Sequence, residues 1–130
     1  MLVPPLLESI CISSRTHSQI DDRYSQVLEN AGIEWIKVER DPESEAASPG
    51  VRLATMHRMK GLEFSRVLLA GVQAGKMPLE GSDYADHASL EDHELRERCL
   101  LYVACTRARD ELVLTGYGRP SKLLALSRIA

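Results

Sequence analysis

The sequence is poor in cysteine and in long hydrophobic runs, which argues against a zinc-binding protein and against a membrane-spanning one. Its three cysteines include no C-x-x-C pair and no Cys/His group with zinc-finger spacing, so we expect buried, reduced thiols and no metal site. The longest apolar runs, residues 67–72 and 99–105, are too short to cross a bilayer, and the first residues lack the features of a signal peptide. We therefore expect a cytoplasmic protein with no membrane segment.

An excess of positive charge is also missing. The chain has 16 Lys and Arg against 19 Asp and Glu, a net charge of −3, whereas domains that bind nucleic acid on their own are usually basic. This balance argues against a nucleic-acid clamp built from this chain alone, but it is compatible with a local basic groove. With 44% hydrophobic and 27% charged residues, the 130-residue chain has the composition of one globular domain.

No complete site for nucleotide hydrolysis is encoded. A phosphate loop needs the pattern G-x-x-x-x-G-K-[ST], and the closest approach, from Gly71 to Met77, is one residue short and ends without a hydroxyl. No apolar strand ends in the paired acids that would hold magnesium. His87 and His93 each follow an Asp near a loop, where solvated surface is the simpler interpretation. The missing phosphate loop excludes a small, self-sufficient nucleotide-binding enzyme.

Short apolar runs do alternate with helical patterns along the chain. This alternation predicts an α/β fold with a mainly parallel sheet of about five strands. We expect the strands at residues 10–13, 33–38, 51–55, 66–72 and 112–115.

Two helices and a short third one are expected between these strands. The first begins at a capping box of Ser18 and Asp21 and ends at Gly32, and the second spans residues 91–108. Pro120 opens the third. The apolar faces predicted for the first two are Ile20, Tyr24, Val27 and Leu28, and Leu95, Cys99, Tyr102 and Val103.

Two segments have the composition of loops. Residues 41–50 are acidic and rich in turn formers, and residues 74–90 carry Gly, Pro, Ser and Asp with little periodicity. We expect the longer loop to bury few side chains, with Met77 and Pro78 as its anchors.

Charged residues flank the ends of several predicted strands. Arg15 follows the first strand, His57, Lys60 and Glu63 follow the third, and Arg107 lies at the end of the long helix. Ligands of doubly wound sheets bind at the carboxyl ends of the strands, so we expect Arg15, Glu63 and Arg107 to share one sheet edge. Two arginines and a carboxylate suit a phosphate-bearing ligand with a sugar hydroxyl, although each residue singly could be in a surface ion pair.

Three runs together resemble motifs of the superfamily 1 helicases of the UvrD/Rep type. I-S-S-R-T-H-S-Q from residue 12 looks like motif IV, V-R-L-A-T-M-H-R-M-K-G-L-E-F-S-R-V from residue 51 resembles motif V, and E-R-C-L-L-Y-V-A-C-T-R-A-R-D from residue 97 resembles motif VI. Their order and spacing fit as well, so that the resemblance covers residues 10–127.

The resemblance implies that residues 1–130 are the second, C-terminal RecA-like domain of an ATP-dependent DNA helicase, with a three-layer α/β fold. The N-terminal RecA-like domain of the same protein would supply the phosphate loop and the magnesium site. ATP with Mg²⁺ would then be bound, and single-stranded DNA translocated, only by the complete two-domain motor. The chain alone is expected to be inactive as an enzyme.

The resemblance also implies roles for individual residues. Arg15 would approach the γ-phosphate, Arg107 would be the arginine finger, Glu63 would accept from the ribose hydroxyl, and Gly61 would let the backbone come close. Leu101 and Tyr102 would pack the motif VI helix on the sheet. Coupling of the nucleotide to the DNA track would fall to Thr55, His57, Arg58 and Lys60, and above all to His57.

The sequence departs from the family pattern at two places. Cys99 stands where a second arginine is common, and only residues 41–50 separate the runs between which larger members insert an extra domain. An alternative is therefore a degenerate helicase-like module that binds or regulates a partner without ATPase activity. Retention of Arg15, Glu63 and Arg107 together favours the motor domain.

Overall fold

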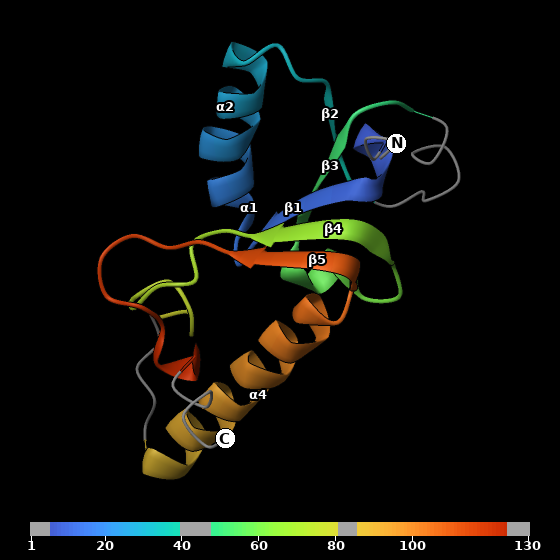
Figure 1. The fold of residues 1–130 in the computed structure, drawn as a ribbon. Coiled ribbons are helices and arrows are strands. Elements are labelled where there is room, and N and C mark those ends of the chain that lie inside the picture. Colours follow the sequence, from blue (N-terminus) through green and yellow to red (C-terminus); the bar gives the residue numbers. More distant parts are fainter. Residues whose placement is uncertain (1–5, 40–47, 81–85, 125–130) are drawn as a thin grey trace.

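Five segments, rich in β-branched and apolar residues, form one sheet in the computed structural model, which describes residues 6–39, 48–80 and 86–124 (Figure 1). Every pair of neighbouring strands is parallel, and the strand order is β2-β3-β1-β4-β5. The first strand of the chain is thus the central one. The strands are β1 (Ile10–Ser14), β2 (Trp35–Lys37), β3 (Val51–Thr55), β4 (Phe64–Leu69) and β5 (Ala108–Leu114).

The boundaries of β2, β4 and β5 differ from the predicted ones. β4 and β5 begin earlier than expected because Phe64 is in register with Ala108 and donates its N–H to the Arg107 carbonyl. β4 ends at Leu69, two residues before Gly71, whose φ of 76° turns the chain away. β2 keeps only three of the six expected residues.

The first helical region is continuous from α1 (His17–Gln19) through the π-helical η2 (Ile20–Tyr24) to α2 (Ser25–Asn30). Its capping box is formed by Thr16 and Gln19, two residues before the predicted Ser18 and Asp21. Ile20 and Leu28 are buried as expected, but Val27 is 60% exposed. Ile20, Tyr24 and Leu28 pack together at i+4 spacing, and Val27 lies outside this stripe.

Helix α4 (His87–Cys105) begins four residues earlier than predicted. Asp86 caps it, because the Asp86 carboxylate accepts the N–H of Ser89 at 2.7 Å. The predicted apolar face is wrong, since Leu95 and Tyr102 are 54% and 69% exposed. The buried face consists of Glu97, Leu101 and Ala104. Apolar residues are spread around this helix, so that contact with the sheet, and not the sequence pattern, selects its inner face.

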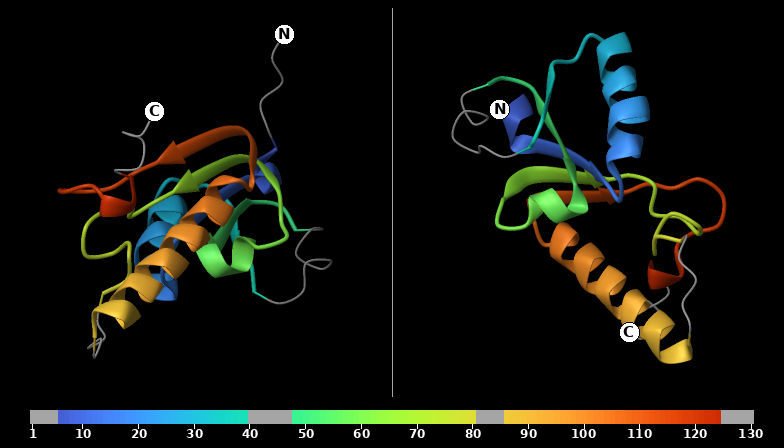
Figure 2. Two further views of the ribbon diagram at one scale, coloured as in Figure 1. Left: turned by 90° about the horizontal axis from the view of Figure 1, so that it is seen from below. Right: turned by 180° about the vertical axis from the view of Figure 1, so that it is seen from behind.

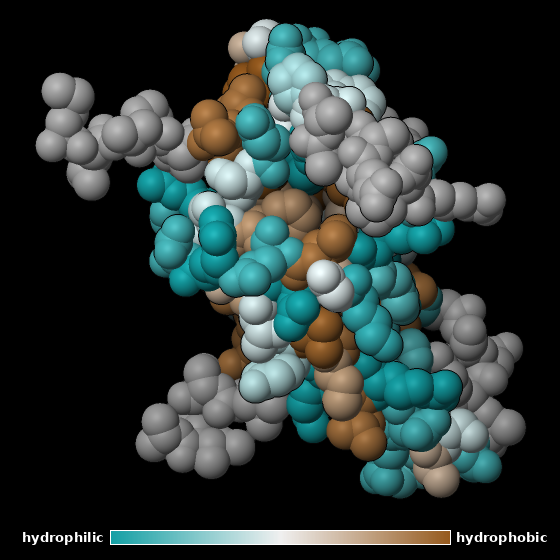
Figure 3. Space-filling model, turned by 90° about the vertical axis from the view of Figure 1, so that its right-hand side faces the viewer, coloured by the Kyte–Doolittle hydropathy of each residue, from teal (hydrophilic) through white to brown (hydrophobic). Residues whose placement is uncertain are grey.

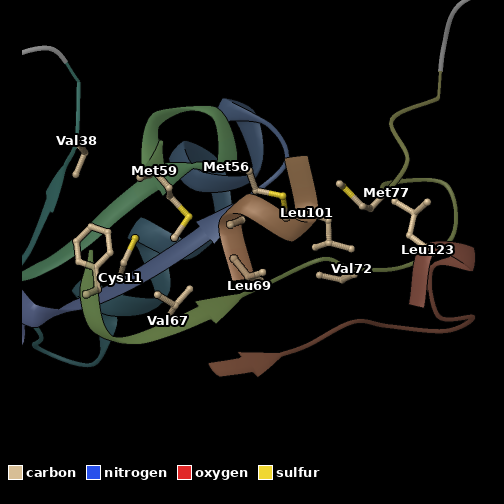
Figure 4. Close-up of a cluster of buried hydrophobic side chains, with 13 residues drawn as sticks. Cys11, Val38, Met56, Met59, Val67, Leu69, Val72, Met77, Leu101 and Leu123 are labelled. Carbon is tan, nitrogen blue, oxygen red and sulfur yellow. The ribbon is translucent and has the colours of Figure 1, made fainter. Parts of the chain in front are cut away.

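The helices cover both faces of the sheet, giving three layers (Figures 1 and 2). On one face, α4 and the 3-10 helix η3 (Met56–Met59) enclose the larger core, which includes the buried Met56, Met59, Leu69 and Leu101 (Figure 4). On the other, Ile20 and Leu28 pack on Val51 and Leu53. The predicted α/β domain with about five parallel strands is confirmed.

The described parts of the two predicted loops are tied to the sheet. In the longer one Met77 is fully buried and Pro78 half-buried, as predicted for its anchors. Residues 41–47 and 81–85 of these loops lie outside the described residues, as does the end of the chain from residue 125. In the described ranges, no helix is long and apolar enough to cross a membrane.

Candidate functional site

The predicted site residues lie at two opposite edges of the sheet. Arg15 comes directly after the last residue of β1, whereas Glu63 and Arg107 come directly before the first residues of β4 and β5. In a parallel sheet these positions are opposite edges, separated here by the six residues of β4, or about 20 Å. The prediction of one shared edge is therefore wrong, because it did not distinguish residues that follow a strand from residues that precede one.

At the amino edge, the Arg107 guanidinium is held by three acceptors. Its Nε donates to the carbonyl of Val103 at 3.2 Å, its Nη1 to that of Leu62 at 3.4 Å, and its Nη2 to Oγ1 of Thr106 at 3.2 Å. Arg107 thus caps the C-terminal end of α4 and ties it to the chain between β3 and β4. Since a guanidinium has five N–H groups, two of them have no acceptor among these three contacts.

Glu63 lies beside an arginine that the sequence analysis did not select. The Nε of Arg109 is 3.9 Å from Glu63 Oε1, and its Nη2 donates to Ser65 Oγ at 2.7 Å. Glu63 and Arg109 are both exposed. Arg109 stands two residues after Arg107, so the alternation of a strand starting at Ala108 would have identified it; the predicted strand began only at residue 112.

Gly61 lies in the same connection and has a φ of 83°. No atom lies within 4 Å of the position that a Cβ would take there. The left-handed backbone, not a close approach within this chain, is what requires glycine at this position.

At the carboxyl edge, residues that follow β1 and β3 form an open pocket of about 490 Å³. Its two arginines, Arg15 and Arg58, give it a cationic character. We call it the cationic pocket; its lining residues are Arg15, Thr16, His17, Thr55, His57 and Arg58. Lys60 directly follows the last residue of η3. It is exposed and does not line this pocket.

A buried glutamate of α4 lies behind the cationic pocket. Both carboxylate oxygens of Glu97 accept from Arg15 Nε, at 2.9 and 3.1 Å, and Oε1 also accepts the N–H of Leu79 at 2.6 Å. Burial alone would raise the pKa of Glu97, but the hydrogen bonds from Arg15 and Leu79 outweigh it and lower that pKa. The sequence analysis missed Glu97, although its spacing to Leu101 and Ala104 is that of one helix face.

His57 is predominantly neutral at pH 7 in this environment. Partial burial lowers its pKa, the Arg15 guanidinium lowers it further, and Glu97 opposes these two effects. In the part of the chain that the structure describes, no group of three His, Cys, Asp or Glu residues could hold a metal ion.

These features define the class of the protein as a parallel α/β domain with arginines at one sheet edge and a cationic pocket at the other. A family model of the UvrD-like helicase C-terminal domain matches residues 6–118. The chain belongs to this family, and the match confirms the resemblance seen in the three sequence motifs.

Individual relatives agree with this assignment. The chain is 47% identical to YjcD of Bacillus subtilis (strain 168) over 51% of its own length and 9% of that protein. It is 41% identical to the ATP-dependent DNA helicase Rep of Salmonella typhimurium over 56% of its length and 10% of Rep. The C-terminal domain of a possible DNA helicase from Lactobacillus plantarum superposes with a TM-score of 0.65 and 25% identity, over 90% of this chain and 61% of that one. The chain thus spans about a tenth of the curated relatives.

Proposed function

We propose that this chain is the second motor domain of an ATP-dependent DNA helicase and that its amino edge completes an ATP site. The observation that carries this proposal is the meeting of Gly61, Glu63 and Arg107 at that edge. The N-terminal RecA-like domain of the same protein would lie against this edge and supply the phosphate loop and magnesium. Figure 3, which views this side, shows hydrophobic surface between hydrophilic groups, a mixture typical of interfaces between domains.

The residues of the amino edge fit the phosphate and ribose ends of ATP. Arg107 offers its two remaining N–H groups to a phosphate, and the exposed carboxylate of Glu63 can accept from a ribose hydroxyl. Mg²⁺-ATP, when bound, supplies the phosphoryl group and the metal that shields its charge. This chain contributes, through Arg107, positive charge that stabilises the phosphate in the transition state.

We propose that the cationic pocket contacts the phosphodiester backbone of single-stranded DNA. Arg15, Arg58 and His57 supply donors there, and the Thr55 hydroxyl lies at the same wall. Arg15 is too far from Arg107 to reach the same phosphate of ATP, so this role replaces the one that the sequence resemblance implied for it. Lys60 lies on the connection between the two edges, and its side chain is exposed to solvent.

A degenerate helicase-like module that only binds a partner is the alternative. The two proposals differ in whether Arg107 takes part in hydrolysis. ATP turnover should be compared for this chain, for the complete two-domain protein, and for that protein with Arg107→Ala or with Arg96→Ala. Arg96 is the matched control. Its guanidinium is exposed on α4, where it pairs with Asp92 at the helix surface.

We expect no turnover from the chain alone, because it lacks a phosphate loop. In the complete protein, Arg107→Ala should reduce turnover by about 10³-fold or more, as loss of an arginine finger does, while Arg96→Ala leaves it unchanged. Arg107→Lys should recover little, since an ammonium cannot reproduce the planar fork. Magnesium-dependent turnover by the 130-residue chain, or full activity of Arg107→Ala, would refute the shared ATP site.

A further inference from the structure

Helix α4 runs from one functional edge of the sheet to the other. Its Glu97 lies behind the cationic pocket, and its last residue, Cys105, is two residues before Arg107 at the amino edge. Glu97 and Cys105 are eight positions apart, or about 12 Å along the helix. The helix runs obliquely beneath the sheet, against the direction of the strands, and its C-terminal end lies near the start of β5 (Figure 1).

Glu97 joins three separate segments of the chain at the carboxyl edge. Its carboxylate binds Arg15 at the end of β1 and the N–H of Leu79 in the turn after β4, and it projects from α4. His93, one turn earlier on α4, reaches the Leu79 carbonyl through Nε2 at 2.8 Å. The Arg15 and Glu97 side chains are only 14% and 5% exposed. Separating two charges that are largely shielded from water is costly, so that a movement of Arg15 takes α4 with it.

The other end of α4 is connected just as directly. Arg107 donates to Val103 in the last turn and to Leu62 in the connection that leads from the cationic pocket to Glu63. Met56 and Met59 of η3, in that same connection, are buried in the core that α4 covers. A shift of α4 relative to the sheet therefore displaces the Arg107 guanidinium.

We propose that Glu97 is a positioning residue that clamps Arg15 to α4, so that a ligand in the cationic pocket displaces Arg107. We call the Arg15–Glu97 ion pair the clamp. This inference rests on the proposed function in one respect, namely that the ligand of the pocket is a single strand of nucleic acid. Arg15 binds Glu97 through Nε, which orients its two terminal nitrogens for the phosphates of the strand. The ion pair thus converts phosphate binding at one edge into a movement at the other.

The test uses NMR signals of arginine Nε–H groups and of histidine rings in the 130-residue chain, titrated with a short single-stranded oligothymidylate. In the wild type we expect the ligand to shift the signals of Arg15 and His57, and also that of Arg107. In Glu97→Gln the His57 shift should remain and the Arg107 shift should be lost. Glu94→Gln is the matched control, because Glu94 lies on the same helix and pairs with Lys122 at the surface.

A second variant tests the clamp independently of any folding defect in Glu97→Gln. Arg15→Lys keeps the positive charge of the pocket but removes the Nε contact, so it should also lose the Arg107 shift while still binding the ligand. An Arg107 shift that persists in Glu97→Gln or in Arg15→Lys would overturn the clamp and leave the proposed DNA contact intact.

The clamp and the DNA contact can also fail separately. If the oligonucleotide shifts no pocket signal in the wild type, the proposed DNA contact is refuted. The clamp is then judged without ligand, from the hydrogen exchange of Arg15 Nε–H. Slow exchange in the wild type and fast exchange in Glu97→Gln supports it, and equally fast exchange in both overturns it.

Discussion

Glu97 is the residue whose charge we expect to matter most for stability. Its carboxylate accepts from both Arg15 and Leu79 in a buried position. Glu97→Ala leaves that guanidinium and that N–H without their partner, so it should lower the free energy of unfolding at pH 7 by about 3 kcal/mol. Urea denaturation measures the loss, and Glu94→Ala at the helix surface should cost less than about 1 kcal/mol.

The same carboxylate predicts a direction for the pH dependence. The pKa of Glu97 is lower in the folded state than its ordinary value of 4.5. Its contribution is therefore complete above pH 4.5 and is lost as the pH falls through the lower, folded-state value. The difference between the wild type and Glu97→Ala should shrink in that range. A difference that stays constant down to pH 3 would contradict the ionised pair.

His57 predicts how nucleic-acid binding responds to acid. Burial and the Arg15 guanidinium hold its pKa below the ordinary 6.5, so at pH 7 it contributes little charge to the cationic pocket. Protonation as the pH falls through this lowered pKa should tighten the binding of single-stranded DNA by the chain. Fluorescence anisotropy of a labelled oligonucleotide measures this, and His57→Gln should flatten the response. An equal increase in His57→Gln would assign the effect to another group.

The site could be predicted from sequence only as far as its motifs identify residues. Of the three residues predicted to share one edge, Glu63 and Arg107 do so, because they precede two strands that are neighbours in the sheet. Arg15 lies at the carboxyl edge, and the sequence motif that contains it does not indicate this position. Glu97 was missed because a glutamate on a helix reads as solvent-exposed until a buried partner 82 positions away is known.

At the scale of whole elements, strands were easier to predict than helix faces. β1 and β3 match their predicted ranges within one residue, since short apolar runs between turn formers leave few alternatives. The face of α4 was predicted wrongly, because Leu95 and Tyr102 have the same spacing pattern as the residues that are truly buried. Contact with η3, β4 and β5 distinguishes the two faces.

The corrected face of α4 gives a paired prediction. Leu101→Ala removes a side chain buried in the larger core, so it should lower the free energy of unfolding by about 2–4 kcal/mol. Tyr102→Ala, at the next position but exposed, should cost less than about 1 kcal/mol. Thermal or urea unfolding of both variants measures the difference. A larger loss for Tyr102→Ala would restore the face predicted from sequence.

For the whole molecule, the charge balance limits what this domain binds alone. Its net charge is −3, and the positive groups of the cationic pocket are few. We expect binding of single-stranded DNA weaker than about 1 μM at physiological salt, with a strong decrease as salt rises. Arg58→Ala should weaken it further and reduce the salt dependence, whereas Arg96→Ala should not. Micromolar or tighter binding at physiological salt would contradict a track that is shared between two domains.

The place of β1 in the sheet has a consequence for how the protein is made. Of the five strands this one is synthesised first, yet it lies between β3 and β4, whose last residues are Thr55 and Leu69. At about 5–20 residues per second, synthesis from Ser14 to Leu69 takes several seconds, during which at least one side of β1 has no partner. The nascent chain therefore carries an unpaired apolar strand throughout that interval, and chaperone binding and misassembly should both be concentrated there.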